Sequence, residues 1–289
     1  MQTLRELIRG DDLVVAPLVL NPMMARMAQA AGFKAGYLSG GSLGWYKCVT
    51  EANITLPEMA TLCMDLRAAA DLPIVLDAGG GWGDPVHMHR TIALTQAAGF
   101  AGIEIEDQVL PRRLEHHLGI EHLIPIELML GRIAEALAAR TDPDLVIIAR
   151  TNAVRGPGMG VDEAIRRGEA FHKAGADMLF IFAQKAEDLR RIGERLPPPL
   201  MLFLPRDGLN NFGLSAAELA KLGYRLGASP GNALAATVKA VRQSYDSLAK
   251  GETDPFLGAG GAEREMKAAQ QTSGFDRLVA IERRTMKDG

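Results

Sequence analysis

The chain has 289 residues, of which 47% are hydrophobic and 23% are charged, and its formal net charge is −3. This length fits two average domains or one large α/β barrel, and the hydrophobic share is ample for a buried core. The small negative charge excludes the strongly basic surface of a typical nucleic-acid-binding protein, so we expect no nucleic acid partner.

The cysteine content and the hydropathy pattern indicate in which cellular compartment the protein is expected. Two cysteines, Cys48 and Cys63, form neither a disulfide framework nor a zinc motif. No uninterrupted apolar stretch approaches the roughly 20 residues that a membrane helix needs. Residues 1–6 carry charge and lack an apolar signal core. We therefore expect a cytoplasmic protein without a membrane partner.

Eight apolar runs predict β-strands, at residues 13–16, 35–39, 73–77, 102–106, 145–150, 178–182, 200–204 and 225–228. Helical patterns separate most of these runs, at residues 57–70, 85–98, 126–140, 161–173 and 216–222. The runs are almost wholly apolar, as in parallel strands that are covered on both faces. Strands that alternate with helices in this way predict an α/β fold with a (β/α)8 TIM-type barrel. A doubly wound open sheet is the alternative.

The pattern changes after residue 228. We expect a helix at residues 232–249, a glycine-rich loop at 258–261, and a charged helix at 262–286 that is broken near Gly274. We therefore divide the chain into a catalytic barrel, residues 1–241, and a helical arm, residues 242–289. The arm has few apolar positions of its own, so it is expected to pack on the barrel or on a neighbouring subunit.

Charged residues end three consecutive strand runs, namely Asp77, Glu106 and Arg150. Because the carboxyl ends of parallel strands meet at one mouth of a barrel, these side chains are expected to converge. A few carboxylate oxygens supplemented by water are typical of a magnesium site, and a planar guanidinium suits a substrate carboxylate. A helix cap for Asp77 and a salt bridge for Arg150 are the structural alternatives.

A polar, glycine-rich segment, Tyr-Leu-Ser-Gly-Gly-Ser at residues 37–42, follows the second strand and is predicted to be a loop. The backbone amides of Gly40 and Gly41, together with the Ser39 hydroxyl, could cradle a carboxylate or a developing enolate oxygen. The alternative is an ordinary turn in which glycine supplies a positive φ.

These motifs, taken in order with Asp-Ala-x-x-Gly-aromatic-Gly, Ile-Glu-Asp-Gln and Ile-Ile-Ala-Arg-Thr-Asn-Ala, resemble the isocitrate lyase / phosphoenolpyruvate mutase superfamily. The resemblance spans roughly residues 4–241 and is greatest to its short, 2-methylisocitrate lyase-like members. It implies a modified barrel whose last helix swaps between subunits, usually in a homotetramer built as a dimer of dimers. It also implies Mg²⁺, or alternatively Mn²⁺, and a 2-oxo or 2-hydroxy carboxylic acid that reacts through an enolpyruvate-like intermediate.

The resemblance also implies roles for individual residues. Asp77 and Glu106 would hold the metal, and Arg150 would grip the substrate carboxylate during catalysis. The expected substrate-binding residues are Tyr37, Ser39, Gly40, Gly41, Arg150 and Asn210.

The chain departs from the family pattern around the expected metal. Gly79 stands where the family has a second aspartate, and Phe182 stands where relatives place a glutamate. The region of a further aspartate holds Thr50 or Glu51. These changes predict weaker or rearranged metal binding and a pocket that is less acidic and more apolar.

A further departure concerns the proton donor of the lyases, a loop cysteine at whose position this chain has Leu114. Leucine cannot release a proton, so Glu115 or His116 is expected to act as the catalytic acid or base. The alternative is that this loop is only a solvated lid that gates the site.

These features support an enzyme, a Mg²⁺-dependent carbon–carbon lyase of the 2-methylisocitrate or dimethylmalate lyase kind. Decarboxylation of a 2-oxo diacid such as oxaloacetate, which needs no cysteine donor, and cleavage of a C–P bond are the alternative reactions. The alternative from another class is a catalytically degenerate protein that binds a small acid, because a shared scaffold does not establish activity.

Overall fold

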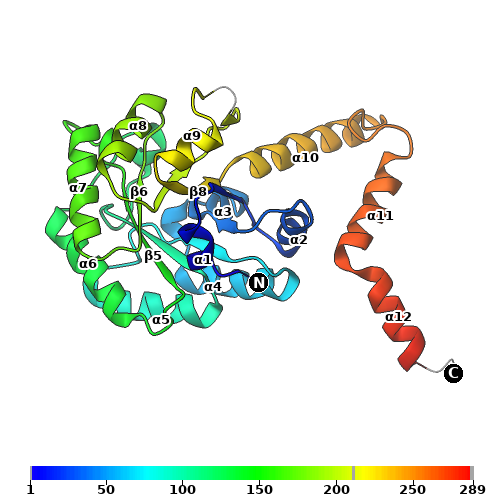
Figure 1. Cartoon of the computed structure of the whole chain (residues 1–289). Coiled ribbons are helices and arrows are strands. Elements are labelled where there is room, and N and C mark those ends of the chain that lie inside the picture. Colours follow the sequence, from blue (N-terminus) through cyan, green and yellow to red (C-terminus); the bar gives the residue numbers. More distant parts are fainter. Residues whose placement is uncertain (1, 210–211, 287–289) are drawn as a thin grey trace.

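The computed structural model describes residues 2–209 and 212–286. Its centre is a sheet of eight parallel strands in the order β1-β8-β7-β6-β5-β4-β3-β2 (Figure 1). The strands are β1 (Val14–Pro17), β2 (Gly36–Leu38), β3 (Ile74–Asp77), β4 (Gly102–Glu106), β5 (Val146–Thr151), β6 (Met178–Ile181), β7 (Leu200–Phe203) and β8 (Tyr224–Ser229). An isolated bridge between Leu18 and Tyr37 joins the two ends of the sheet, so the barrel is nearly closed.

Helices alternate with the strands, and those between β1 and β8 pack around the sheet, whereas α1 precedes β1 and α10, α11 and α12 follow β8 (Figure 1). They are α1 (Leu4–Arg9), α2 (Pro22–Ala30), α3 (Gly40–Tyr46), α4 (Leu56–Ala69), α5 (Met88–Ala98), α6 (Ile126–Ala139), α7 (Val161–Lys173), α8 (Ala186–Arg195), α9 (Ala216–Lys221), α10 (Asn232–Lys250), α11 (Gly261–Ser273) and α12 (Phe275–Thr285). Short 3₁₀ helices are η1 (Glu51–Asn53), η2 (Pro85–His87), η3 (Leu114–Leu118) and η4 (Ala153–Arg155).

The predicted TIM-type barrel is confirmed, and the open sheet is excluded because β1 pairs with β8 and the Leu18–Tyr37 bridge links the other edge of β1 to β2. Each predicted strand differs from the observed strand by no more than one residue at either end. The predicted loop after the second strand is wrong, because residues 40–46 form α3. Ser39 is the N-cap of this helix, and its hydroxyl oxygen accepts a hydrogen bond from the Ser42 amide at 3.3 Å.

The core has two layers, because alternate strand residues point to opposite faces of the sheet. One apolar layer lies between the strands and the outer helices. The other fills the inside of the barrel, where Leu4 and Ile8 of α1 join strand residues such as Val75 and Phe180. This apolar filling gives way to polar side chains toward the carboxyl ends of the strands.

The arm begins with α10, and its later part breaks at Gly274, whose φ is +75°, as predicted. The division expected between residues 241 and 242 falls inside α10, which is continuous there. α11 and α12 extend away from the barrel (Figure 1), and Arg26 of α2 donates a hydrogen bond to the Thr272 carbonyl oxygen at 2.8 Å. Within the described ranges, no helix is long and apolar enough to span a membrane.

Candidate functional site

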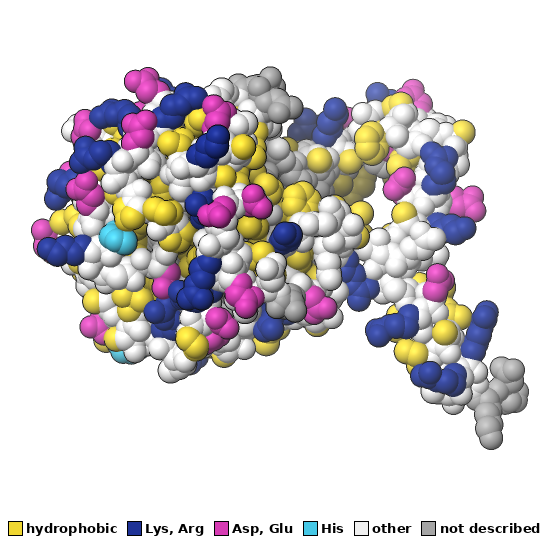
Figure 2. Space-filling view, viewed as in Figure 1, with side chains coloured by type: hydrophobic (Ala, Val, Ile, Leu, Met, Phe, Trp, Pro, Cys, Tyr) yellow, Lys and Arg dark blue, Asp and Glu magenta, His cyan; other side chains and the backbone are white. Residues whose placement is uncertain are grey.

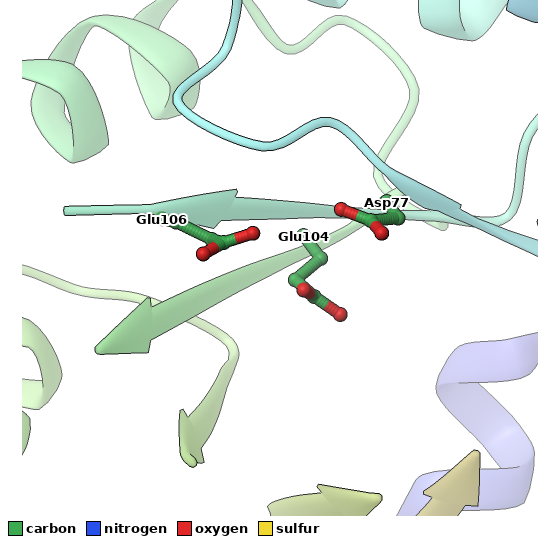
Figure 3. A group of neighbouring side chains, drawn as sticks. All are labelled: Asp77, Glu104 and Glu106. Carbon is green, nitrogen blue, oxygen red and sulfur yellow. The ribbon is translucent and has the colours of Figure 1, made fainter. Parts of the chain in front are cut away.

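The register of the sheet brings the charged strand ends together. Asp77 on β3 is aligned with Glu104 on β4, and Glu106 is aligned with Arg150 on β5. Ligand oxygens of Asp77, Glu104 and Glu106 all lie within 4.8 Å of one another, and the three side chains are buried. Figure 3 shows these carboxylates side by side, with Asp77 and Glu106 at the ends of their strands and Glu104 two residues before the end of β4. We call these three residues the carboxylate cluster.

Glu104 was not among the predicted site residues. It lies two positions before Glu106 on the same strand, so both side chains point into the barrel. The alternation of apolar and acidic residues in Ile-Glu-Ile-Glu is the sequence signal that indicates this orientation. Asp107, which follows Glu106, points out of the barrel instead, and its carboxylate accepts a hydrogen bond from Arg167 at 2.9 Å.

Arg150 is held in place from two sides. Its Nη1 donates to Glu104 at 2.5 Å, and its Nε donates to the side-chain oxygen of Asn152 at 2.9 Å. The guanidinium carbon also lies 4.8, 5.2 and 5.0 Å from the ring centroids of three phenylalanines. These are Phe180, Phe182 and Phe203. The rings form an apolar wall where a second acid had been expected from the resemblance, so the predicted apolar character is present on this side.

The carboxylate cluster favours a bound cation. Burial, with repulsion from Glu106 and Glu51, raises the pKa of Asp77 to about 6. Burial also raises the pKa of Glu104 to about 8, against the opposing effect of Arg150. A cation that binds between these carboxylates would offset their mutual repulsion, and a set of oxygen ligands suits a hard divalent ion such as Mg²⁺. The donor set therefore fits the implied metal, with Glu104 added to Asp77 and Glu106.

Ser39, Gly40 and Gly41 also lie at the site, where they form the N-terminal end of α3. The Gly40 amide donates to Asp77 Oδ2 at 3.0 Å, and so its donor is already used by the protein. Ser39 and Gly41 line the cavity in front of Arg150. The expected cradle is thus corrected, because the Gly40 amide orients Asp77 whereas Ser39 and Gly41 face the cavity.

Tyr37 also differs from its expected place. Its side chain is fully buried, and its hydroxyl donates to Glu104 Oε2 at 2.8 Å. It lines neither of the cavities described below, because it lies deeper in the barrel than the strand ends. Tyr37 therefore supports Glu104 and has no access to a substrate.

A second acid that the prediction did not place, Glu51, belongs to the site. η1 carries it there, and its Oε1 lies 2.6 Å from both Arg112 Nε and His116 Nε2. Although burial opposes the shift, the His116 hydrogen bond and Arg112 lower the pKa of Glu51 to about 2. The pocket is therefore more acidic than the missing aspartates had suggested.

The two residues predicted as acid or base occupy different surroundings. Burial alone would lower the pKa of His116, but its hydrogen bond to Glu51 raises it. Glu115 is more than half exposed, and its carboxylate pairs with His122 at 2.6 Å, so it does not join the site. Asn210, the remaining predicted residue, lies outside the described residues.

Two cavities meet at the carboxyl ends of the strands. One, of about 520 Å³, is lined by residues that include Ser39, Gly41, His116, Arg150, Arg155, Phe182 and Phe203. The other, of about 370 Å³, is lined by residues that include Gly40, Ile54, Met59, Gly79, Trp82 and Leu110. Glu51, Asp77 and Arg112 line both cavities and separate them. A small acid in the larger cavity would contact Arg150 on one side and Asp77 on another.

Comparison with known proteins agrees with this geometry. The chain matches the phosphoenolpyruvate phosphomutase family over residues 4–249. It is 33% identical to 2,3-dimethylmalate lyase of Eubacterium barkeri over 253 residues, which cover 86% of each chain. It is 37% identical to oxaloacetate decarboxylase of Pseudomonas fluorescens (strain SBW25) over 250 residues, 86% of this chain and 83% of that protein.

Solved structures show the same likeness. The crystal structure of phosphonopyruvate hydrolase in complex with oxalate and Mg²⁺ has a TM-score of 0.85 and 29% sequence identity, and the match covers 98% of each chain. The similar proteins are thus a carbon–carbon lyase, a decarboxylase and a hydrolase of a phosphonate. They share a fold whose enzymes bind small carboxylic acids and act on them.

Proposed function

The chain belongs to the phosphoenolpyruvate mutase and isocitrate lyase superfamily, and on that premise we propose that it is a metal-dependent carbon–carbon lyase. Its substrate is a small 2-oxo or 2-hydroxy carboxylic acid that reacts through an enolpyruvate-like intermediate. The observation that carries the proposal is the buried carboxylate cluster beside Arg150 in a cavity of about 520 Å³. The carboxylate cluster would hold a metal that binds oxygens of the acid, and the adjacent Arg150 would bind its carboxylate.

The charges of the site support a divalent metal. Four carboxylates, those of Glu51 and the carboxylate cluster, face the guanidiniums of Arg112 and Arg150. The formal sum of −4 and +2 is −2, or −1 when protonated His116 beside Glu51 is counted, so the site keeps a net negative charge that favours a divalent cation. When bound, such a cation would act as a Lewis acid for the negative charge that develops on the enolate oxygen.

The protein's own residues bind and orient the acid. Arg150 is fixed by Glu104 and Asn152, so its guanidinium is held ready to bind the substrate carboxylate. Phe182 and Phe203 line the same cavity and exclude water from the reacting carbon. Ser39 lines the same cavity, so its hydroxyl is available to an oxygen of a bound substrate.

His116 and Glu51 are proposed to supply the proton that the missing cysteine would give. His116 Nδ1 faces the Arg113 carbonyl oxygen at 2.6 Å, and a carbonyl only accepts, so Nδ1 carries a hydrogen. The proton at Nε2 is then held against Glu51 Oε1, at the wall of the cavity. From this position the pair can donate to a leaving carbanion.

Decarboxylation of a 2-oxo diacid is the second candidate within this class. Its support is that neither cysteine lines a cavity at the site, because Cys63 is buried in α4 and Cys48 is exposed after α3. Loss of CO₂ needs the same electron sink as retro-aldol cleavage, but it needs no thiol acid. The 37% identity to an oxaloacetate decarboxylase is compatible with this reaction.

The test compares 2,3-dimethylmalate, 2-methylisocitrate and oxaloacetate with and without Mg²⁺, because cleavage of each releases pyruvate. We expect metal-dependent pyruvate release from at least one acid and metal-dependent thermal stabilisation by oxalate. His116→Gln should lower kcat by about 10²-fold while oxalate binding is retained, and His122→Gln is the matched control. Stabilisation by acids without turnover of any would identify a binding protein and reject the enzyme.

We further propose that the arm packs on a second copy of the chain, in line with the oligomer that the family resemblance implies. The arm exposes large apolar side chains that a monomer leaves in water, including Phe256, Met266, Phe275, Leu278 and Ile281. Figure 2 shows hydrophobic side chains along the extended helices. Exposed apolar surface of this extent is typical of an interaction site.

Replacing apolar residues of α12 by acids should break this association. Leu278→Glu with Ile281→Glu puts two charges on one helical face, and a subunit contact there would have to desolvate them. Light scattering coupled to size exclusion should report a smaller assembly than for the unaltered chain. Lys267→Glu on α11 is the control for a change of charge alone. A double variant with unchanged mass would refute the proposed contact.

A further inference from the structure

We propose that Arg112 is a built-in counter-cation of the site, which competes with the divalent metal for Glu106. This inference rests on the metal site of the proposed function. Arg112 is 7% exposed, and it comes from the loop after β4 instead of from a strand. Its Nη1 lies 2.6 Å from Glu106 Oε1, and its Nε lies 2.6 Å from Glu51 Oε1. One guanidinium thus joins two buried carboxylates.

Arg112 also borders the position where the family pattern has a second aspartate. A Cβ atom placed on Gly79 would lie 3.6 Å from Arg112 Nη1, an ordinary contact distance, and the φ of +51° at this position is one that residues other than glycine rarely adopt. Gly79 therefore offers no carboxylate beside Arg112. With one carboxylate fewer than in the family pattern, the site exerts a weaker attraction on an added cation.

The hydrogen bonds of Glu106 show why the competition is direct. Its Oε2 accepts from Asn152 Nδ2 at 2.9 Å, and its Oε1 lies 2.6 Å from Arg112 Nη1 and 3.4 Å from Arg150 Nη1. A carboxylate oxygen has two lone pairs, and Oε1 faces two cations, so a metal can ligate Glu106 through Oε1 only if one of these two guanidiniums leaves. Asn152 and Arg150 are fixed at the end of the adjacent strand, whereas Arg112 lies on a loop. Arg112 is therefore the donor that a metal displaces.

Displacement of Arg112 would couple metal binding to the loop. Arg112 and His116 both contact Glu51 Oε1, so they hold residues 112–116 against η1. Arg112 also stands between the two cavities. A metal that displaces Arg112 from Glu106 would thus leave the Arg112 side chain held only by Glu51, at the wall between the two cavities.

The test measures metal binding by the full chain without substrate. Free Mn²⁺ is followed by electron paramagnetic resonance, and Mg²⁺ binding is followed by calorimetry. Arg112→Gln should bind Mn²⁺ about tenfold or more tightly than the unaltered protein, because no buried ion pair has to be broken. Arg113→Gln removes the same charge from an exposed neighbour and should leave the affinity within about twofold.

A second variant keeps the inference testable if Arg112→Gln folds poorly. Arg112→Ala vacates the space of the guanidinium, so added guanidinium ion at a non-denaturing concentration should weaken Mn²⁺ binding in this variant. Potassium chloride at matched ionic strength is the control, and the unaltered protein should respond equally to both salts. Restored competition would show that the cation itself, and not the fold of the loop, sets the metal affinity.

The outcomes separate this inference from the proposed metal site. Mn²⁺ binding that is unchanged or weaker in the Arg112 variants, with binding retained by the unaltered protein, overturns only the inference. No Mn²⁺ binding by any of these proteins overturns the metal site and the inference together. Binding by Arg112→Gln in the absence of measurable binding by the unaltered protein supports both.

Discussion

Replacing Arg150 by glutamine is expected to lower the free energy of unfolding by about 3–5 kcal/mol and to abolish oxalate binding. The loss of stability follows because the fully buried Glu104 would lose the guanidinium that faces it at 2.5 Å, and it would then be either an unpaired charge or a carboxyl that must take up a proton. The loss of binding follows because Arg150 is the cation that the aromatic wall holds at the cavity. Denaturant unfolding and calorimetry with oxalate and Mg²⁺ measure the two effects.

Two further variants separate these effects. Adding Glu104→Gln to Arg150→Gln removes the unpaired charge, so much of the stability should return while oxalate binding stays lost. Arg167→Gln is the matched control, because Arg167 is also buried and pairs with Asp107, but outside the barrel. It should destabilise the fold without affecting oxalate. An Arg150→Gln protein that binds oxalate normally would contradict the carboxylate-binding role.

The parts of the site that sequence could predict are those fixed by the strands. Parallel strands end at one mouth, so Asp77, Glu106 and Arg150 had to lie near one another once the barrel was recognised. Glu104 is equally predictable, because side chains two positions apart on a strand point to the same face and Ile-Glu-Ile-Glu therefore places Glu104 beside Glu106. The apolar runs fixed the strand positions to within one residue because covered parallel strands tolerate few polar residues.

Contacts between distant segments could not be predicted in this way. Glu51 reaches the site because η1 packs tightly on α3, where a Cβ on Gly44 would lie 2.7 Å from the Glu51 amide nitrogen. Arg112 reaches it because a loop folds back between Glu51 and Glu106. Neither contact has a periodic pattern along the chain, since each depends on the shape of a pocket that other segments create. The helical state of Gly40 likewise depended on the Ser39 cap outweighing the low helix propensity of glycine.

Replacing Asp77 by asparagine is expected to weaken Mn²⁺ binding by about 10²-fold or more and to abolish turnover. The change keeps the size of the side chain and an oxygen that can accept from the Gly40 amide, but it removes the ligand charge and the oxygen that accepts from the Gly79 amide at 3.2 Å. Asp107→Asn is the control, because Asp107 is also a buried carboxylate but faces out of the barrel. It should leave the Mn²⁺ affinity unchanged.

The same substitution should stabilise the metal-free protein above about pH 6. Burial raises the pKa of Asp77 from 3.8 to about 6. An acid whose pKa is higher in the folded state than in the unfolded state lowers the free energy of unfolding as the pH rises from the unfolded pKa to the folded pKa. This decrease reaches its full size above the folded pKa. Asparagine carries no such charge, so the variant should unfold with a free energy greater by roughly 1–3 kcal/mol at pH 8. A residue that weakens the fold but is needed for metal binding has a functional role. If Asp77→Asn instead lowered stability and left Mn²⁺ affinity unchanged, Asp77 would be a structural helix-cap residue and the metal assignment would fail.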